Sequence, residues 1–172
     1  STADVDGLSF PEGAKLAYVT QTTLSVDETG ETIAALRRRF PEIYAPKKED
    51  ICYATSNRQW AVKEMLAEIQ LLLVIGSRNS SNSVRLVEVA RECGAEAHLI
   101  DRADEVREEW LDGARVVGIS SGASAPENLV QELVQLFRDR GVSDVSEFHV
   151  INEDVRFMLP KPIREAATAG AS

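Results

Sequence analysis

Cysteine and histidine are scarce in this sequence, with two of each among 172 residues. Two cysteines do not make a disulfide framework, and the CxxC spacing of a structural metal site is absent. We therefore expect a reducing, cytoplasmic setting. Long apolar runs are also missing, since none approaches the ~20 residues of a membrane-spanning helix. The first ten residues do not resemble a signal peptide, and we expect no membrane partner.

A surplus of basic residues is absent as well. The formal net charge is −9, whereas nucleic-acid binding needs clustered Lys and Arg for the phosphates. We expect no nucleic-acid partner, and we interpret the short basic run "LRRRF" (Leu36–Phe40) as the solvated face of a helix. The content of 44% hydrophobic and 27% charged residues is typical of a globular protein with a substantial core.

What is present is an alternation of strand-like apolar runs and helical patterns, which predicts an α/β fold with a mostly parallel sheet. The expected strands are Ala14–Val19, Leu71–Ile75, Glu96–Ile100 and Arg115–Ile119, with a final extended pair at Phe148–Ile151 and Val155–Leu159. The expected helices are Asp27–Phe40, Ser56–Ile69, one that ends at Gly94, a short one at Ala103–Trp110, and Glu127–Arg140. Pro41–Ile51 is a candidate linker, and we expect the last eight residues to be disordered.

Loops rich in small polar residues precede four of these helices: "TQTTLS", "CYATSN", "GSRNSSNS" and "SSGASA". Three predict a capping box, at Ser25/Glu28, Ser56/Gln59 and Ser124/Glu127. Each box alone is a structural feature. In a parallel sheet, however, such loops gather at the carboxyl edge, where free helix N–H groups suit an anion. A phosphorylated ligand therefore fits "GSRNSSNS" and "SSGAS", and plain turn chemistry remains the alternative.

The two cysteines differ in their surroundings. Cys93 lies on the apolar stripe of its predicted helix, so we expect a buried core thiol. Cys52 follows the charged "KKED" and directly precedes a helix. Lysines and a helix N-terminus both stabilise the thiolate, which binds metal and attacks electrophiles. His98 and His149 lie in or near predicted strands, so we expect core or edge residues rather than ligands.

A second pattern, "GISSG" (Gly118–Gly122), matches the nucleophile elbow of serine hydrolases. Ser120 would be the nucleophile, followed in the chain by an acid (Asp139 or Asp144) and by His149. Against this interpretation, the next helix is expected to begin at Ser124 rather than directly after Ser120. The chain is also short for that fold.

Read in order, the loops resemble one family. The strings "YVTQTTLSVDET", "RFPEIYAPKKEDICYATSNRQWAV", "VIGSRNSSNSVRLVEVA" and "GISSGASAPENLVQELV" are similar to the LytB/IspH family of 4-hydroxy-3-methylbut-2-enyl diphosphate reductases. The resemblance runs from Lys15 to Arg164 and covers the second half of a family member. It implies part of a trefoil-like arrangement of three α/β domains around a central iron–sulfur site. Residues 1–45 would be the C-terminal part of the middle domain, 46–146 the third domain, and 147–172 a tail that packs on the first domain.

The resemblance also implies a reaction and its residues. The family converts its substrate to isopentenyl and dimethylallyl diphosphate by reductive dehydroxylation, with electrons from a donor such as ferredoxin or flavodoxin. Cys52 matches one of three cysteines that hold a 4Fe–4S cluster, whose fourth iron acts as a Lewis acid. Ser80, Asn82 and Ser124 match residues that hold the diphosphate, with Ser81 beside them. Thr22 matches a hydroxyl in the proton-delivery network.

The remaining family ligands would come from an N-terminal half, so we expect this chain alone to be inactive and to lack a cluster. An alternative of another class stays open. The chain would then be a non-catalytic phosphate- or nucleotide-binding α/β module. The two interpretations differ at Cys52, because only the reductase needs that thiol.

Overall fold

Five consecutive apolar residues form the central strand of the structure, a computed structural model that describes residues 1–46 and 50–150. This strand, β1 (Leu71–Ile75), is completely buried. It pairs in parallel with β2 (Glu96–Ile100) on one side and β3 (Val117–Ser121) on the other. The strand order is therefore β2-β1-β3, and the α/β fold with a parallel sheet is confirmed.

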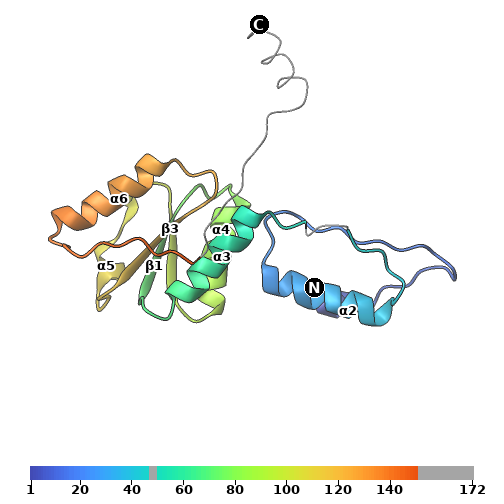
Figure 1. Cartoon of the computed structure of the whole chain (residues 1–172). Helices are drawn as coiled ribbons and strands as arrows, with labels where there is room; N and C mark the ends of the chain where they lie inside the picture. Colours follow the sequence, from blue (N-terminus) through green and yellow to red (C-terminus); the bar gives the residue numbers. More distant parts are fainter. Residues whose placement is uncertain (47–49, 151–172) are drawn as a thin grey trace, which may run out of the picture.

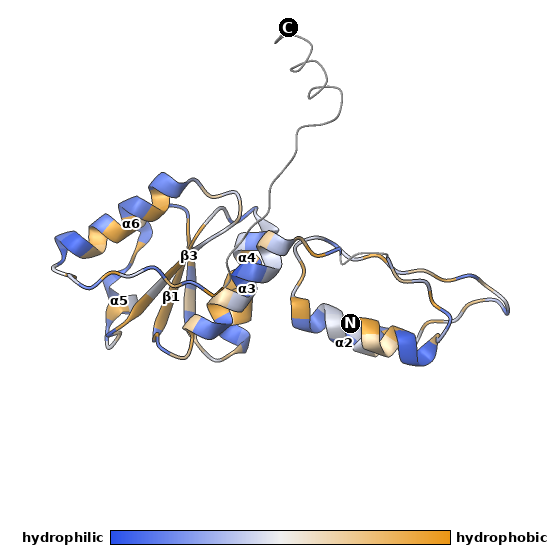
Figure 2. Cartoon of the chain, in the orientation of Figure 1, coloured by the Kyte–Doolittle hydropathy of each residue, from blue (hydrophilic) through white to orange (hydrophobic). Residues whose placement is uncertain are grey.

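Helices cover both faces of this sheet, which explains why β1 is apolar at every position. On one face lie α3 (Tyr53–Met65) and α4 (Ser81–Glu92), and on the other lies α6 (Glu127–Asp139) (Figure 1). Alternate residues of β1 serve the two faces. The hydrophobic core therefore has two clusters. The cluster under α3 and α4 contains Val62, Leu72, Val74, Leu86, Val87, Ala90 and Ala97. The cluster under α6 contains Leu71, Leu73, Ile75, Ile100, Leu133 and Phe137. Figure 2 shows the hydrophobic side of α6 turned toward the sheet.

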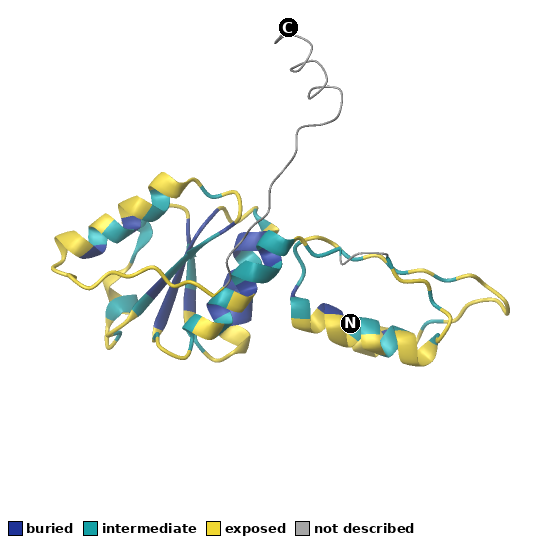
Figure 3. Cartoon of the chain, viewed as in Figure 1, coloured by how far each residue is buried: buried dark blue, intermediate teal, exposed yellow. Residues whose placement is uncertain are grey.

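The N-terminal segment, residues 1–46, is built differently. It contains α1 (Thr2–Val5) and α2 (Val26–Arg39), and its buried residues are Val5, Ser25 and Thr29. Figure 3 shows this part almost entirely exposed or half-buried, in contrast to the sheet. The prediction of a strand at Ala14–Val19 is wrong. This segment forms only one isolated parallel bridge among the described residues, between Ala17 and Tyr44. A strand needs a continuous row of partners, and the described residues offer none here.

Three other expectations about the elements need correction. The expected helix Ala103–Trp110 is split into a 3-10 turn, η1 (Ala103–Glu105), and α5 (Glu108–Leu111), because Val106 is extended. The third strand begins at Val117, since Gln70 Oε1 accepts the Arg115 and Val116 N–H groups. Residues 142–150 contain no strand, and Val155–Leu159 and the tail lie outside the described residues.

The helix starts and ends are also informative. Gly94 and Gly141 follow α4 and α6 with φ of 85° and 93°, as expected for helix ends. Ser25 caps α2, because its Oγ accepts the Glu28 N–H at 3.4 Å. None of the three predicted capping boxes is complete among the described residues. The Glu28 carboxylate pairs with Arg85 and not with the Ser25 N–H. Ser56 lies inside α3, whose N-cap is Cys52, and α6 begins after Pro126 rather than Ser124.

Cys93 is exposed, not buried. Helix α4 ends at Glu92, and Cys93 is its C-cap, so the turn into Gly94 carries the thiol away from the apolar stripe. His98 is a half-buried edge residue, as expected, and its ring stacks on Trp110 at 3.8 Å. None of the helices within the described ranges combines the length and apolar composition needed to cross a bilayer.

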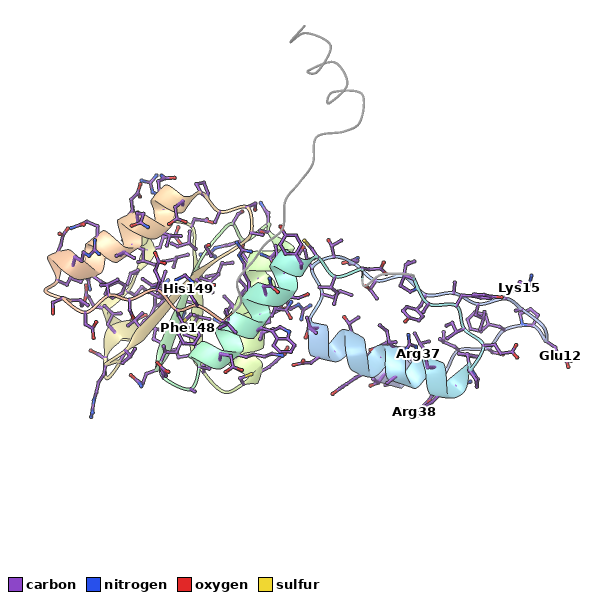
Figure 4. The ribbon with its side chains drawn as sticks, in the orientation of Figure 1. Glu12, Lys15, Arg37, Arg38, Phe148 and His149 are labelled. Atoms are coloured by element: carbon purple, nitrogen blue, oxygen red, sulfur yellow. The ribbon has the colours of Figure 1, made fainter. Side chains whose placement is uncertain are left out.

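The basic run at the end of α2 faces solvent, as expected. Arg37, Arg38 and Arg39 are all exposed, and Figure 4 shows the first two on the outer part of the N-terminal segment. Arg37 donates to the Tyr18 hydroxyl at 2.9 Å, and Arg39 donates to the Leu8 carbonyl at 2.7 Å. These contacts tie α2 to the extended chain beside it.

Candidate functional site

The carboxyl ends of the three parallel strands are joined by backbone hydrogen bonds. Gly76, directly after β1, donates its N–H to Ile100 at the end of β2 (3.0 Å), and Gly122, directly after β3, donates to Ile75 (2.9 Å). The loops that follow β1 and β3 therefore leave the sheet side by side. This is the edge at which α/β proteins bind ligands.

The loop after β1 leads into the first turn of α4. Ser80 is the N-cap, and its Oγ accepts the Ser83 N–H at 3.4 Å. The loop is ordered before the helix begins, because Ser77 Oγ accepts the Asn79 N–H (3.2 Å) and the Ser77 carbonyl accepts the Ser80 N–H (2.9 Å). Ser81 lies on the exposed side of the same turn. The turn thus presents hydroxyls and free helix N–H groups, which favour an anion.

Asn82 is the unusual residue of this turn. Its side chain is 6% exposed, yet neither its Oδ1 nor its Nδ2 has a hydrogen-bond partner among the described residues. A buried amide without partners costs about 1–3 kcal/mol. A polar ligand at the start of α4 would supply the missing partner.

Ser124 belongs to the neighbouring loop. It is exposed in the turn that follows Gly122, where Ala125 donates its N–H to the Gly122 carbonyl at 3.0 Å. The described residues show no hydrogen bond between Ser124 and Ser80 or Asn82. The strand-end hydrogen bonds nevertheless hold the two loops on one edge, so the structure brings these sequence-predicted residues to the same part of the sheet.

Cys52 and Thr22 form a second pair. The Cys52 N–H donates to the Thr22 carbonyl at 3.1 Å, and both residues are exposed. Cys52 is the N-cap of α3, with its carbonyl accepting the Thr55 and Ser56 N–H groups. Asp50 secures the same junction, because its Oδ2 accepts the Thr20 N–H at 2.8 Å. The structure therefore joins the backbones of two candidate residues that lie 30 positions apart in the sequence.

A cleft of about 260 Å³ lies between these two regions. It is lined by Gln21, Thr23 and Leu24 from the N-terminal segment and by Arg78, Asn79, Ser81, Val84, Arg85 and Glu88 from the loop and α4. Arg85, one of the lining residues, pairs with Glu28 of α2 at 3.3 Å. The cleft joins the loop that carries Thr22 to the loop that carries Ser80.

The described residues supply one ligand here rather than a complete metal site. Within residues 1–46 and 50–150, no three His, Cys, Asp or Glu side chains are grouped to hold a metal ion. Cys52 is exposed at the N-cap of α3, so its sulfur atom is accessible to a shared metal centre. A metal cluster at Cys52 therefore needs ligands from outside the described residues.

The hydrolase geometry is not found. Ser120 lies within β3 and pairs with Val74, and α6 begins only at Glu127, so Ser120 is not on a sharp strand-to-helix turn. His149 is exposed and contacts Glu147 at 3.0 Å. Figure 4 shows His149 beside Phe148, on the chain that follows α6.

Sequence reasoning missed the residues that hold the loops in place. Ser83 is 1% exposed and packs against Gly76 and Gly122. Gln59 is fully buried and bonds to the backbone of Leu24 and Val26. A glycine directly after each of two neighbouring strands was a usable signal for the first group. Gln59 gave no such signal, because its spacing from Ser56 matched a capping box.

Comparison with known proteins agrees with this architecture. The family model described as LytB protein matches residues 1–138. A curated 4-hydroxy-3-methylbut-2-enyl diphosphate reductase of Alcanivorax borkumensis is 52% identical over 162 residues, which are 94% of this chain and 52% of the relative. One of Rhodococcus jostii is 53% identical over 165 residues, which are 95% of this chain and 49% of the relative.

A solved structure shows the same relationship. The E-1-hydroxy-2-methyl-but-2-enyl-4-diphosphate reductase of Plasmodium falciparum superposes with a TM-score of 0.87 at 32% identity, covering 99% of this chain and 54% of that chain. The chain thus spans about half the length of the relatives that it matches. Because the family model covers the strand-end loops and the helices that begin there, this chain belongs to the LytB family.

Proposed function

We propose that this chain is the C-terminal half of a 4-hydroxy-3-methylbut-2-enyl diphosphate reductase. The complete enzyme would remove the C4 hydroxyl of its substrate as water, with two electrons and two protons, and release isopentenyl and dimethylallyl diphosphate. Relatives that carry this name are about 50% identical to the chain over nearly its whole length, and each is about twice as long. The proposal therefore includes an N-terminal half as partner.

The observation that carries this proposal is the buried, unpartnered amide of Asn82. In the proposed complex, its Nδ2 donates to a diphosphate oxygen, and the Ser80 and Ser124 hydroxyls donate from the two adjacent loops. Ser81 adds a hydroxyl on the exposed side of the turn. The helix N-terminus supplies partial positive charge. This arrangement suits a diphosphate, whose several oxygens accept hydrogen bonds from two loops at once.

Cys52 and Thr22 would serve the other end of the substrate. We assign Cys52 as one of three thiolate ligands of a 4Fe–4S cluster, the other two coming from the N-terminal half. When bound, such a cluster supplies electrons and a Lewis-acidic iron. Thr22 is exposed, and its backbone carbonyl accepts the Cys52 N–H. The Thr22 hydroxyl would hold the leaving oxygen of the substrate and pass a proton to it.

The proposed N-terminal half also has a surface to cover. Large apolar side chains of the N-terminal segment are exposed, including Phe10 at 46%, Val19 at 84% and Tyr44 at 63%. Few residues of this segment are buried within the described chain. A further partner is a reduced electron-carrier protein such as ferredoxin or flavodoxin, which the proposed reaction requires.

The proposal is tested in the complete enzyme, this chain together with an N-terminal half. We expect Asn82→Asp to raise KM for the diphosphate substrate by about tenfold or more, because a hydrogen bond to a charged group contributes about 1.5–3 kcal/mol. The matched control is Asn128→Asp on the exposed face of α6, which should leave KM unchanged. An unchanged KM in Asn82→Asp would contradict the assignment of the amide.

The second candidate, a phosphate-binding module without catalysis, is favoured by the same Asn82 observation. It predicts that inorganic pyrophosphate binds the 172-residue chain and that substitution of Cys52 has no effect on any activity. Reductase activity of the complete enzyme that depends on Cys52 would exclude the module.

A further inference from the structure

The side chain of Ser83 occupies the space between the two loops of the candidate diphosphate site. Ser83 is the third residue of α4 and is 1% exposed. A Cβ atom added to Gly76 or to Gly122 would lie within 3.0 Å of Ser83 Oγ. One serine side chain is therefore packed against the first residue after β1 and the first residue after β3.

Gly76 and Gly122 are required because a larger side chain would overlap Ser83, and not because their backbone conformation favours glycine. The glycines with positive φ are Gly13, Gly94, Gly113 and Gly141, so Gly76 and Gly122 have φ values that any residue adopts. Their Cα atoms face the Ser83 side chain, and a methyl group at either position has no room. The three residues thus form a contact that fixes how far apart the two loops lie.

This contact is made by residues that adjoin the proposed diphosphate ligands in the chain. Gly76 begins the loop that ends at Ser80 and Asn82, and Gly122 lies two residues before Ser124. Ser83 itself follows Asn82 and donates its N–H to Ser80 Oγ. A shift at Ser83 would therefore move ligands of both loops together.

We propose that Ser83 is a positioning residue that sets the separation of the two diphosphate-binding loops. The proposal rests on the proposed function, because it assumes that both loops hold one diphosphate. A misplacement of about 1 Å is enough to change ligand binding or catalysis by as much as about 100-fold. The size of the side chain at position 83 would then determine how well the two loops reach the same ligand.

The geometry predicts which substitutions rescue one another. A Cβ at Gly122 would lie 3.3 Å from Ser83 Cβ once Oγ is removed, whereas a Cβ at Gly76 would still lie 2.6 Å from Ser83 Cβ. Ser83→Ala should therefore remove the steric clash of the methyl group in Gly122→Ala but not the clash in Gly76→Ala. Ser83→Gly should relieve both, because the next atoms are 3.7 Å and 3.8 Å away.

The experiment measures kcat and KM of the complete enzyme for these single and double variants. We expect Gly76→Ala and Gly122→Ala each to raise KM for the diphosphate substrate by about tenfold or more, with a smaller change in kcat. In the Ser83→Ala background the effect of Gly122→Ala on KM should fall to within about twofold, while that of Gly76→Ala persists. Each double variant is compared with its own Ser83 variant, because Ser83→Gly also weakens the helix.

Gly118→Ala is the matched control for general destabilisation. Its added Cβ would lie within 3.0 Å of Met65 and Ile69, on the α3 side of β3. It should lower the melting temperature and leave KM unchanged. An equal rise of KM in Gly118→Ala, or failure of Ser83→Ala to restore Gly122→Ala, would overturn the role of Ser83. Failure of the proposed function is distinguishable, since the wild-type complete enzyme would then not reduce the substrate at all.

Discussion

The side-chain amide of Gln59 donates from Nε2 to the carbonyl oxygen of Leu24 at 2.8 Å, although 35 residues separate them. Its Oε1 accepts the Val26 N–H, the first of α2, at 3.0 Å. Gln59 is completely buried in the middle of α3. One side chain thus joins the helix that begins at Cys52 to the loop that carries Thr22.

The first prediction is that Gln59→Leu lowers the stability of the fold. Leucine fills a similar volume but leaves the Leu24 carbonyl and the Val26 N–H without their partner. We expect the free energy of unfolding to fall by about 1–3 kcal/mol, the range for partly buried groups left unsatisfied. Urea unfolding of the 172-residue chain measures this change.

Gln70→Leu is the control for that prediction. Gln70 Oε1 also accepts two backbone N–H groups, those of Arg115 and Val116 at 3.1 Å and 2.9 Å. Gln70 is exposed, so water replaces the lost bonds and the change should be smaller. Equal losses in the two variants would show that burial of Gln59 does not matter.

The second prediction concerns the two cysteines, both exposed. In anaerobically reconstituted complete enzyme, we expect Cys52→Ser to lose most of its iron, because a serine hydroxyl is a poor substitute for a thiolate ligand. Cys93→Ser should keep wild-type iron content, since Cys93 is the C-cap of α4, at the opposite end of that helix from the candidate site. Iron analysis by mass spectrometry measures both. Unchanged iron content in Cys52→Ser would contradict the cluster assignment and favour the non-catalytic phosphate-binding module.

The third prediction tests the core. Leu133 on α6 is completely buried against β1, so Leu133→Ala should lower the free energy of unfolding by about 2–5 kcal/mol. Val116, which is 47% exposed just before β3, provides the control, and Val116→Ala should change stability by less than about 0.5 kcal/mol. A small effect at Leu133 would mean that α6 is not packed on the sheet as described.

The fourth prediction concerns the chain alone. We expect the isolated, reconstituted 172-residue chain to show no reductase activity, because the described residues supply only one of the three proposed cluster thiolates, Cys52. Mixing it with a separately produced N-terminal half should restore turnover with a low-potential electron donor. Turnover by the isolated chain would contradict the division of ligands between the two halves.

The sheet was predictable because its signals are local. Leu71–Ile75 is apolar at every position, as expected for a strand covered on both faces, and its predicted bounds are the observed ones. The same holds for Glu96–Ile100. Gly94 and Gly141 marked helix ends because the left-handed backbone there favours glycine.

The errors arise where distant contacts override a local pattern. Gln59 has the spacing of a capping partner for Ser56, but it bonds to the N-terminal segment instead. Ala14–Val19 has the composition of a strand, but strand formation depends on neighbours that the described residues do not supply. Cys93 has the spacing of a core residue, but the helix ends one residue earlier.

The candidate site was predictable in its parts and not in its assembly. The string "GSRNSSNS" indicated an anion loop, and the structure places Ser80 and Asn82 on the first turn of α4. Sequence spacing did not reveal that Asn82 lacks partners or that Ser83 packs against Gly76 and Gly122. These facts depend on how two loops from different strands meet.

Helix α4 serves the core and the candidate binding loop at once. Leu86 and Ala90 are completely buried against the sheet, while the first turn of the same helix presents Ser80 and Asn82. The entropy loss of ordering these polar side chains is therefore incurred when the protein folds, and a ligand meets donors that are already preorganised. Loosening the helix at Leu86 would lower the apparent affinity in proportion to the binding-competent fraction of molecules. Affinity at this loop is thus thermodynamically linked to the stability of the helix that carries it.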